Sequence, residues 1–385
     1  MSGFRANREV VAVFVAKAVR TFTYGYLGIL LPLYLADLGL SAAGVGTFVT
    51  LTLAGSATLT WGVRVPAERL GARAALLGLA ALSIAAGALL LLAQAPWMVV
   101  VAAMLGNVAV GAGETGPFLS VEQVIIARAT PAARRTSVLS IYNLLGYGAA
   151  ALGAAVVGML TPRGLFALFL AAAIVQALAY MRLPPAPAAR RAAPAAGPSA
   201  AIIRGLAALF ALDSFAGGFV LQSLVAYFLH VRFGLGLDAL GQIFFVAQLV
   251  TAASLLLAAR FALRFGLLNT MVVSHLASNV FLVAIAFAPS AWLAVALLYA
   301  RQLLSQMDVP TRQAYVMGVV EDHERETAAT TTTLWRTITQ ALSPTLTGWI
   351  MSSVALSAPF VIGGTLKILY DILLYATFKE IKPRD

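Results

Sequence analysis

The chain has 385 residues, of which 61% are hydrophobic and 11% are charged. Soluble domains carry about 25% charged residues, so this composition excludes an ordinary soluble protein and indicates one that faces lipid. The absence of cysteine excludes disulfides, iron–sulfur clusters and thiolate metal sites, and the net charge of +11 is interpreted as basic cytoplasmic loops facing anionic lipid rather than nucleic-acid binding.

The predicted elements begin with a long apolar segment that has no small-residue cleavage site, and it is therefore a first span rather than a signal peptide. A membrane span needs about 20 mostly apolar residues. This criterion predicts twelve spans, at residues 9–36, 42–63, 74–95, 98–127, 137–160, 164–182, 201–231, 237–259, 267–288, 291–319, 328–352 and 357–378. The Pro-, Ala- and Arg-rich connection 183–198 between the sixth and seventh spans is predicted to be a linker.

Lys and Arg set the orientation of the spans, because cytoplasmic loops carry an excess of them. With the N-terminus inside, the opposite side carries Arg163 and Arg232, and almost all other loop Lys and Arg residues fall on the cytoplasmic side. We therefore expect both termini and the linker to be cytoplasmic.

An internal repeat divides the chain. Arg69 and Gly71 match Arg264 and Gly266 at an offset of 195 residues. A second set, Gln123, Arg135 and Gly158, matches Gln313, Arg325 and Gly348 at an offset of 190. Six spans per repeat is an even number, so both halves enter the membrane in the same sense, which is one of the recurring transporter architectures.

The loop Glu68-Arg69-Leu70-Gly71-Ala72-Arg73 resembles the short basic loop between spans two and three of the major facilitator superfamily, with Glu in place of Asp. The Gly-rich stretch 111–116 followed by Pro117 resembles the fourth span of that family. This resemblance implies an all-α membrane protein with 12 transmembrane helices in two parallel, pseudo-symmetric six-helix bundles. The expected bundles are residues 1–182 and 200–385, joined by a cytoplasmic linker at 183–199.

The resemblance also implies a cytoplasmic gate. A carboxylate at Glu68 near basic span ends can latch the two halves when the outward state forms, with Arg128 as its expected partner. The alternative is that the basic residues of this loop serve only as orientation signals. The candidate gate residues are Glu68, Arg69, Gly71, Arg73, Arg128, Arg264 and Gly266.

Inserting a charged side chain at membrane depth costs roughly 2.5–3.5 kcal/mol, so such residues are found there when they are paired, exposed to water or functional. Eight of eleven such residues fall on spans one, four, seven and ten, which line the central cavity in the family that this chain resembles. The exceptions are Arg336, Lys367 and Asp371. Lys367 and Asp371 are four residues apart on one helix, and we expect them to neutralise each other outside the cavity.

Glu114 is the first candidate for proton coupling, because it has no basic neighbour one turn away and burial without a cation favours a protonated carboxyl group. Asp213 is the second candidate, and Asp308 and Glu122 complete the set. The alternative is that these acids are satisfied by hydroxyl groups or by cations. Pro117 and Pro310 predict interrupted helices, which often mark binding sites.

Several arginines facing one cavity would instead form an anion site. Arg20, Arg312 and Arg336 are its candidates, unless acids neutralise them pairwise. Other side chains that could bind a polar substrate are Tyr24, Asn143, Gln222, Gln306 and Gln313.

We therefore expect a secondary active transporter of the plasma membrane that moves a small solute by alternating access. Proton-coupled export of an organic or amphipathic compound is favoured slightly over uptake or exchange of a small organic anion. No catalytic motif, metal-ligand spacing or phosphate-binding loop occurs in the sequence, so we expect neither an enzyme nor a cofactor. The expected partners are the substrate, protons and lipid, with a monomer favoured.

Overall fold

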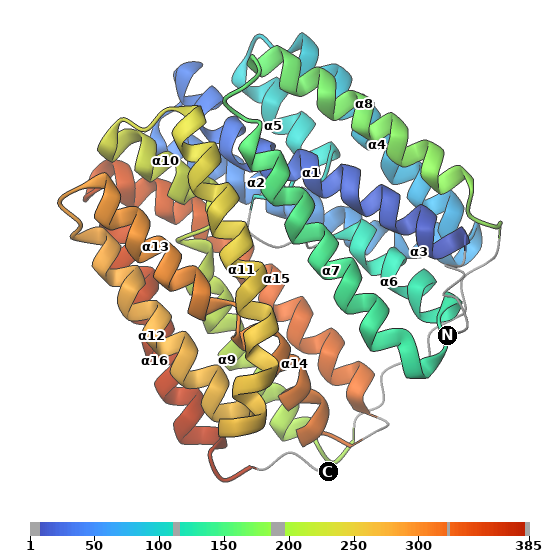
Figure 1. Ribbon diagram of the computed structural model, residues 1–385, viewed down its shortest axis with the longest axis vertical. Helices are drawn as coiled ribbons and strands as arrows, with labels where there is room; N and C mark the ends of the chain where they lie inside the picture. Colours follow the sequence, from blue (N-terminus) through green and yellow to red (C-terminus); the bar gives the residue numbers. More distant parts are fainter. Residues whose placement is uncertain (1–7, 111–115, 186–196, 322–323, 382–385) are drawn as a thin grey trace. The chain divides into compact units, whose positions relative to one another are not determined.

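The computed structural model describes residues 8–110, 116–185, 197–321 and 324–381 (Figure 1). These residues form sixteen helices, and none of them lies in a strand. The first eight helices are α1 (Arg8–Asp37), α2 (Ala42–Gly62), α3 (Arg64–Arg69), α4 (Ala72–Leu92), α5 (Pro96–Leu105), α6 (Pro117–Ala129), α7 (Ala132–Ala155) and α8 (Pro162–Met181). The others are α9 (Ala200–Gly218), α10 (Gln222–Phe233), α11 (Leu237–Phe265), α12 (Leu267–Ala286), α13 (Ala291–Ser305), α14 (Asp308–Val319), α15 (Arg325–Ser353) and α16 (Ala358–Phe378).

The predicted spans coincide with these helices to within a few residues. Nine helices of the described residues are long and apolar enough to cross a membrane, and three shorter apolar helices accompany them. The helix α15 is not among the nine, since a run of threonines at 330–333 and Arg336 make it more polar. The prediction of an all-α, multi-pass membrane protein is confirmed, and twelve spans are consistent with these helices.

Three of the predicted spans are interrupted. The fourth divides into α5 and α6, and the tenth into α13 and α14. Proline explains both breaks, because Pro117 begins α6 and Pro310 falls in the first turn of α14. The N–H groups of the first turn have no partner within the helix, so proline, which lacks an N–H, is tolerated there. The seventh span also breaks, between α9 and α10 at residues 219–221, and no proline predicts this break.

The chain folds into two compact units. The first comprises Met1–Leu40, Leu51–Arg191 and Leu235–Gln248, and the second comprises Ser41–Thr50, Ala192–Gly234 and Leu249–Asp385. The division at residues 191 and 192 falls inside the predicted linker. Each unit also contains a short segment from the other half of the sequence, which the sequence did not predict.

In the first unit, α1 packs against α7 and α8, and α4 packs against α8 (Figure 1). The core of this unit contains Leu76, Ile126, Tyr142 and Tyr180. The helices α1 and α7 approach closely at Gly153, where a side chain would overlap the backbone of Phe22. Small residues such as Gly153 allow this close packing of helices in membranes.

In the second unit, α9 packs against α15 and α16, and α12 packs against α13, α14 and α16. Its core contains Leu206, Phe210, Tyr315 and Leu374. The pairs α9–α16 and α12–α16 are important for the site described below, because they bring the twelfth predicted span next to the seventh and the ninth.

The repeat is visible in the backbone at the starts of α4 and α12. Gly71 precedes α4 with φ 89° and ψ 162°, and Gly266 precedes α12 with φ 83° and ψ 160°. This region of backbone conformation is accessible essentially only to glycine. The two matching residues of the sequence repeat therefore make the same turn.

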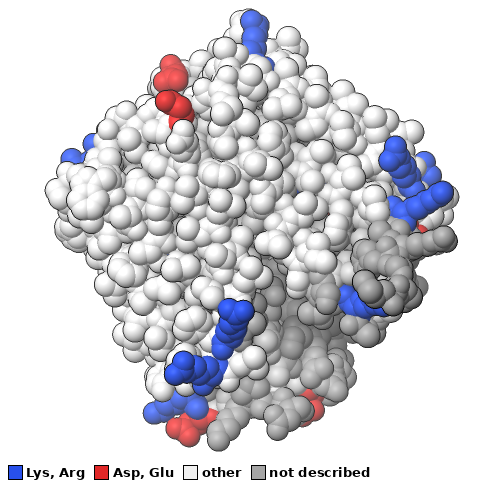
Figure 2. Space-filling view, in the orientation of Figure 1, with Lys and Arg blue, Asp and Glu red and all other residues white. Residues whose placement is uncertain are grey.

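The exterior is apolar, as a lipid-facing surface requires. On the face shown in Figure 2 charged side chains are few, and most of them lie near its edges. All five tryptophans (Trp61, Trp97, Trp292, Trp335 and Trp349) are exposed. Tryptophan is enriched at membrane–water interfaces, and Trp61, Trp97 and Trp292 lie close to helix ends, where an interfacial residue is expected.

Candidate functional site

The first unit contains a buried ion pair between Arg20 and Glu122. Tyr142 and Tyr180 bond to this pair, and Gln176 bonds to Tyr180; we call these five side chains the N-terminal cluster. Arg20 on α1 donates two hydrogen bonds to Glu122 on α6, from Nη1 to Oε1 over 3.1 Å and from Nη2 to Oε2 over 2.6 Å. The two side chains are 1% and 0% exposed. This bidentate geometry is the strongest form of Arg–carboxylate contact.

Two tyrosines complete the coordination of Glu122. Tyr180 on α8 donates to Oε1 over 2.6 Å, and Tyr142 on α7 donates to Oε2 over 2.5 Å. Tyr180 itself accepts hydrogen bonds from Arg20 and Gln176. Each oxygen of Glu122 therefore accepts two hydrogen bonds, and a proton arriving there would have to displace a donor. This favours a structural role for Glu122 and Arg20.

The second unit contains a larger group of buried charges, which we call the C-terminal cluster: Asp213, His275, Asn279, Asp308, Arg312, Lys367 and Asp371. Asp213 on α9 is at its centre. Lys367 on α16 donates to Asp213 over 2.5 Å, and Arg312 on α14 lies 3.5 Å from it and 2.6 Å from Asp308. Arg312 is therefore paired with Asp308, which is the alternative to an anion site that the sequence left open, and it bridges two aspartates.

The expectation that Lys367 and Asp371 neutralise each other is wrong. Lys367 reaches Asp213 on α9 instead. Asp371 contacts α12, where His275 Nδ1 lies 2.8 Å from its Oδ1 and Asn279 Nδ2 donates to its Oδ2 over 2.9 Å. The physical reason is the packing of α16 against both α9 and α12, which gives each charge a closer partner on another helix.

Arg336 on α15 differs from the other candidate arginines. Its Nε donates to the hydroxyl group of Ser214 over 3.0 Å, and among the described residues no carboxylate lies within 4.0 Å of it. The side chain is half-buried. A guanidinium group has five N–H donors, so most of those of Arg336 remain available.

Arg301 on α13 is similar. It donates to Gln302 over 3.2 Å, its Nε is buried with no hydrogen-bond partner, and no acid of the described part of the chain pairs with it. Buried polar groups are normally satisfied, so an unsatisfied guanidinium nitrogen indicates a binding position. Two half-buried arginines with free donors thus lie in the second unit.

The remaining sequence candidates are not members of either cluster. Tyr24 is buried on α1 and donates to the carbonyl group of Gly106 over 3.4 Å. Gln222 is buried at the start of α10, and Gln306 is half-buried between α13 and α14. Asn143 on α7 and Gln313 on α14 are exposed. Glu114 lies outside the described residues.

The candidate gate residues lie at helix ends. Glu68 and Arg69 end the short helix α3, and both are exposed. Arg128 is exposed in the last turn of α6, Arg264 is exposed near the end of α11, and Arg73 is half-buried in the first turn of α4. Within the described part of the chain no ion pair joins Glu68 to Arg128. The latch stays a prediction for another state of the protein.

Sequence reasoning missed His275, Asn279 and Tyr142 as partners of the buried charges. The sequence does contain a hint of the contact between Asp371 and His275. A charged residue such as Asp371 at membrane depth requires a partner, and His275 is a titratable residue in another predicted span. The tyrosines carry no such signal, since a tyrosine in an apolar helix is compatible with many environments.

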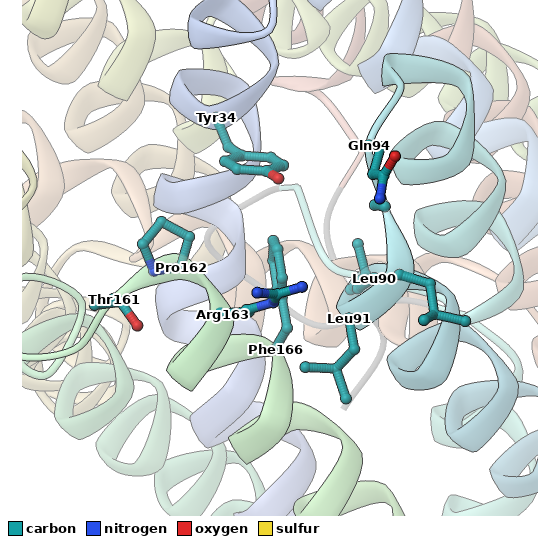
Figure 3. A pocket seen from close by; sticks show the side chains of 10 residues that line it. Tyr34, Leu90, Leu91, Gln94, Thr161, Pro162, Arg163 and Phe166 are labelled. Carbon is teal, nitrogen blue, oxygen red and sulfur yellow. The ribbon is translucent and has the colours of Figure 1, made fainter.

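A cavity of about 350 Å³ lies in the first unit, away from the N-terminal cluster. Tyr34, Gln94, Arg163 and Phe166 are among its lining residues, at the ends of α1, α4 and α8 (Figure 3). Arg20 precedes Tyr34 by 14 residues on α1, which corresponds to about 21 Å along the helix. The cavity is therefore a separate feature near the side that the charge pattern predicts to be external.

A comparison with protein families matches residues 13–305 to the Major Facilitator Superfamily. The chain belongs to this superfamily. It is therefore a multi-pass membrane transporter rather than an enzyme, as the sequence predicted. Members bind small-molecule substrates within a membrane, and the subfamily of this chain is not assigned.

The chain is also similar to individual proteins. The chain is 23% identical to the uncharacterized membrane protein YJR124C of Saccharomyces cerevisiae, covering 97% of this chain and 94% of that protein. Among solved structures it resembles a variant of the nucleoside transporter NupG, with 14% identity, a TM-score of 0.78 and coverage of 97% and 100%. It also resembles the human organic anion transporter MFSD10 (TETRAN), with 16% identity, a TM-score of 0.71 and coverage of 97% and 100%. The TM-scores of these two structures show a common fold, and their low identities carry no conclusion about the substrate of this chain.

Proposed function

We propose that this chain is a proton-coupled secondary active transporter of the plasma membrane and that its substrate is a small organic anion. The observation that carries the proposal is Arg336, a half-buried guanidinium group bonded to Ser214 and not neutralised by any acid of the described residues. A carboxylate or phosphate group of a substrate is the natural partner for such a group.

The balance of charge in the second unit supports an anionic substrate. Within the predicted spans of this unit, the buried and half-buried acids are Asp213, Asp308 and Asp371, and the buried and half-buried basic side chains are Arg301, Arg312, Arg336 and Lys367. Three acids in these spans face four bases, so at least one positive charge is left over. A buried charge requires a partner, and one substrate carboxylate supplies it.

The proposal is tested with purified protein in proteoliposomes, using a panel of radiolabelled mono- and dicarboxylates and phosphate esters under an imposed pH gradient. For any anion that the wild type accumulates, Arg336→Gln should reduce uptake by about tenfold or more, since a hydrogen bond between charged groups contributes about 1.5–3 kcal/mol. Arg232→Gln is the matched control, because Arg232 is exposed and lies outside the cluster. Equal uptake by wild type and Arg336→Gln would contradict the proposal.

Proton-coupled export of an organic or amphipathic compound is the second candidate. The observation that favours it is the pairing of Arg20 with Glu122 and of Arg312 with Asp308, which neutralises two of the three arginines considered for an anion. The same proteoliposomes distinguish the candidates. Gradient-driven movement of lipophilic cations or neutral dyes, with no anion of the panel transported, would favour export. Glu114 remains a candidate coupling residue for either function.

A further inference from the structure

His275 is buried between two carboxylates that come from different helices. Its Nδ1 lies 2.8 Å from Asp371 on α16, and its Nε2 lies 3.7 Å from Asp213 on α9. The imidazole side chain is 5% exposed. Asn279, one turn further along α12, contacts both His275 and Asp371 and holds the carboxylate in place.

The chemistry of imidazole distinguishes its two protonation states in this position. A neutral imidazole has one N–H donor and one nitrogen lone pair, so one of its two nitrogens would present a lone pair to a carboxylate. A charged imidazolium presents an N–H to both carboxylates. The geometry therefore suits the imidazolium, and removal of its proton leaves one of the two contacts repulsive.

The charges around His275 point the same way. Asp213 from α9 and Tyr370 and Asp371 from α16 contact it. The charged side chains around Asp213 and Asp371 are Arg301 from α13, Asp308 and Arg312 from α14, Arg336 from α15, and Lys367 from α16. Within the ion-paired part of the cluster, three aspartates face Arg312 and Lys367. His275 lies next to two of these aspartates, Asp213 and Asp371, and both carboxylates attract a proton on its ring.

We propose that His275 and Asp371 together form a proton-binding site that takes up one proton from water and releases it during the transport cycle. This inference rests on the proposed function for its role in coupling. The proton adds to an imidazole nitrogen, or is shared with the Asp371 carboxylate, and no other bond changes. The site lies on the ninth and twelfth predicted spans and adjoins Asp213, one of the acids that the sequence suggested for this task.

Asp213 connects the proton-binding site to the candidate anion site. It accepts hydrogen bonds from Lys367 and Arg312 and faces His275, and its neighbour Ser214 holds Arg336. Loss of the proton from His275 changes the charge that Asp213 experiences, so Lys367 and Arg312 are held differently. The position of α9, and with it Ser214 and Arg336, thereby depends on whether the proton is bound.

The proton itself is the probe that tests this inference, since no substrate is required. Full-length protein carrying ¹⁵N-histidine is placed in lipid nanodiscs, and the nitrogen signals are followed by NMR from pH 5 to 9. The chain has three histidines, so the signals of His275 are identified by their loss in His275→Gln. We expect these signals to change from the charged to the neutral form within this range.

Removal of the partner carboxylate should change this result. In Asp371→Asn the ratio of charged to neutral His275 at pH 7 should fall about tenfold, because one contact that favours the imidazolium is lost. Asp371→Glu keeps a carboxylate and should retain the charged form. Asp37→Asn, at the exposed end of α1, is the control for loss of an acid elsewhere.

Two results would overturn the inference. One is a wild-type protein in which His275 stays neutral from pH 5 to 9, and this result does not depend on whether any variant folds. The other is a ratio at pH 7 that is unchanged in Asp371→Asn. The titration is independent of transport, so a titrating His275 in a protein that accumulates no anion would contradict the proposed function and leave the proton-binding site standing.

Discussion

Glu122 and Arg312 lie 190 residues apart, which is the offset of the sequence repeat, and they carry opposite charges. Each pairs with the first helix of its own half, Glu122 with Arg20 on α1 and Arg312 with Asp213 on α9. The signs are exchanged between the halves while the pairing is kept. Both halves therefore have an ion pair between the same two helices of the repeat, although the helix that carries the cation differs between the halves.

The N-terminal cluster should behave as a structural element. Glu122→Ala leaves Arg20 buried without a carboxylate, and breaking a buried ion pair in this way costs about 3–5 kcal/mol. Thermal unfolding of the purified protein in detergent should show a clear loss of stability. Replacing both partners, as Arg20→Met with Glu122→Leu, should restore most of it, because neither charge is then left unpaired. A single variant as stable as wild type would contradict this interpretation.

The turns before α4 and α12 allow the repeat to be tested at the level of secondary structure. Gly71→Ala and Gly266→Ala each place a side chain in a backbone region that costs about 1–3 kcal/mol for residues other than glycine. Both variants should lower the unfolding temperature by similar amounts. Gly78→Ala is the control, since Gly78 lies within α4 with open space around it, and alanine there should be neutral or stabilising. A difference in sign between Gly71→Ala and Gly266→Ala would contradict the equivalence of the two turns.

The positions of the helices could be predicted from the sequence better than the contacts between them. Apolar length fixed the spans within a few residues, and proline marked the breaks at Pro117 and Pro310. The break between α9 and α10 has no such mark. The partners of Lys367 and Asp371 could not be read from their i,i+4 spacing, because the packing of α16 against two other helices decides which contact is shorter. Side chains on one helix are predictable neighbours, whereas pairing between helices depends on their packing.

For the whole molecule, the strongest untested prediction is its orientation in the membrane. Basic residues predict that the end of α4 at Gln94 faces outward and that the start of α12 near Asn269 faces the cytoplasm. Both residues are exposed, and the chain has no cysteine that would give a background signal. Gln94→Cys in intact cells should therefore react with a membrane-impermeant maleimide, and Asn269→Cys should react only after the cells are opened. The opposite pattern would place both termini outside and would contradict the orientation that the basic residues predict.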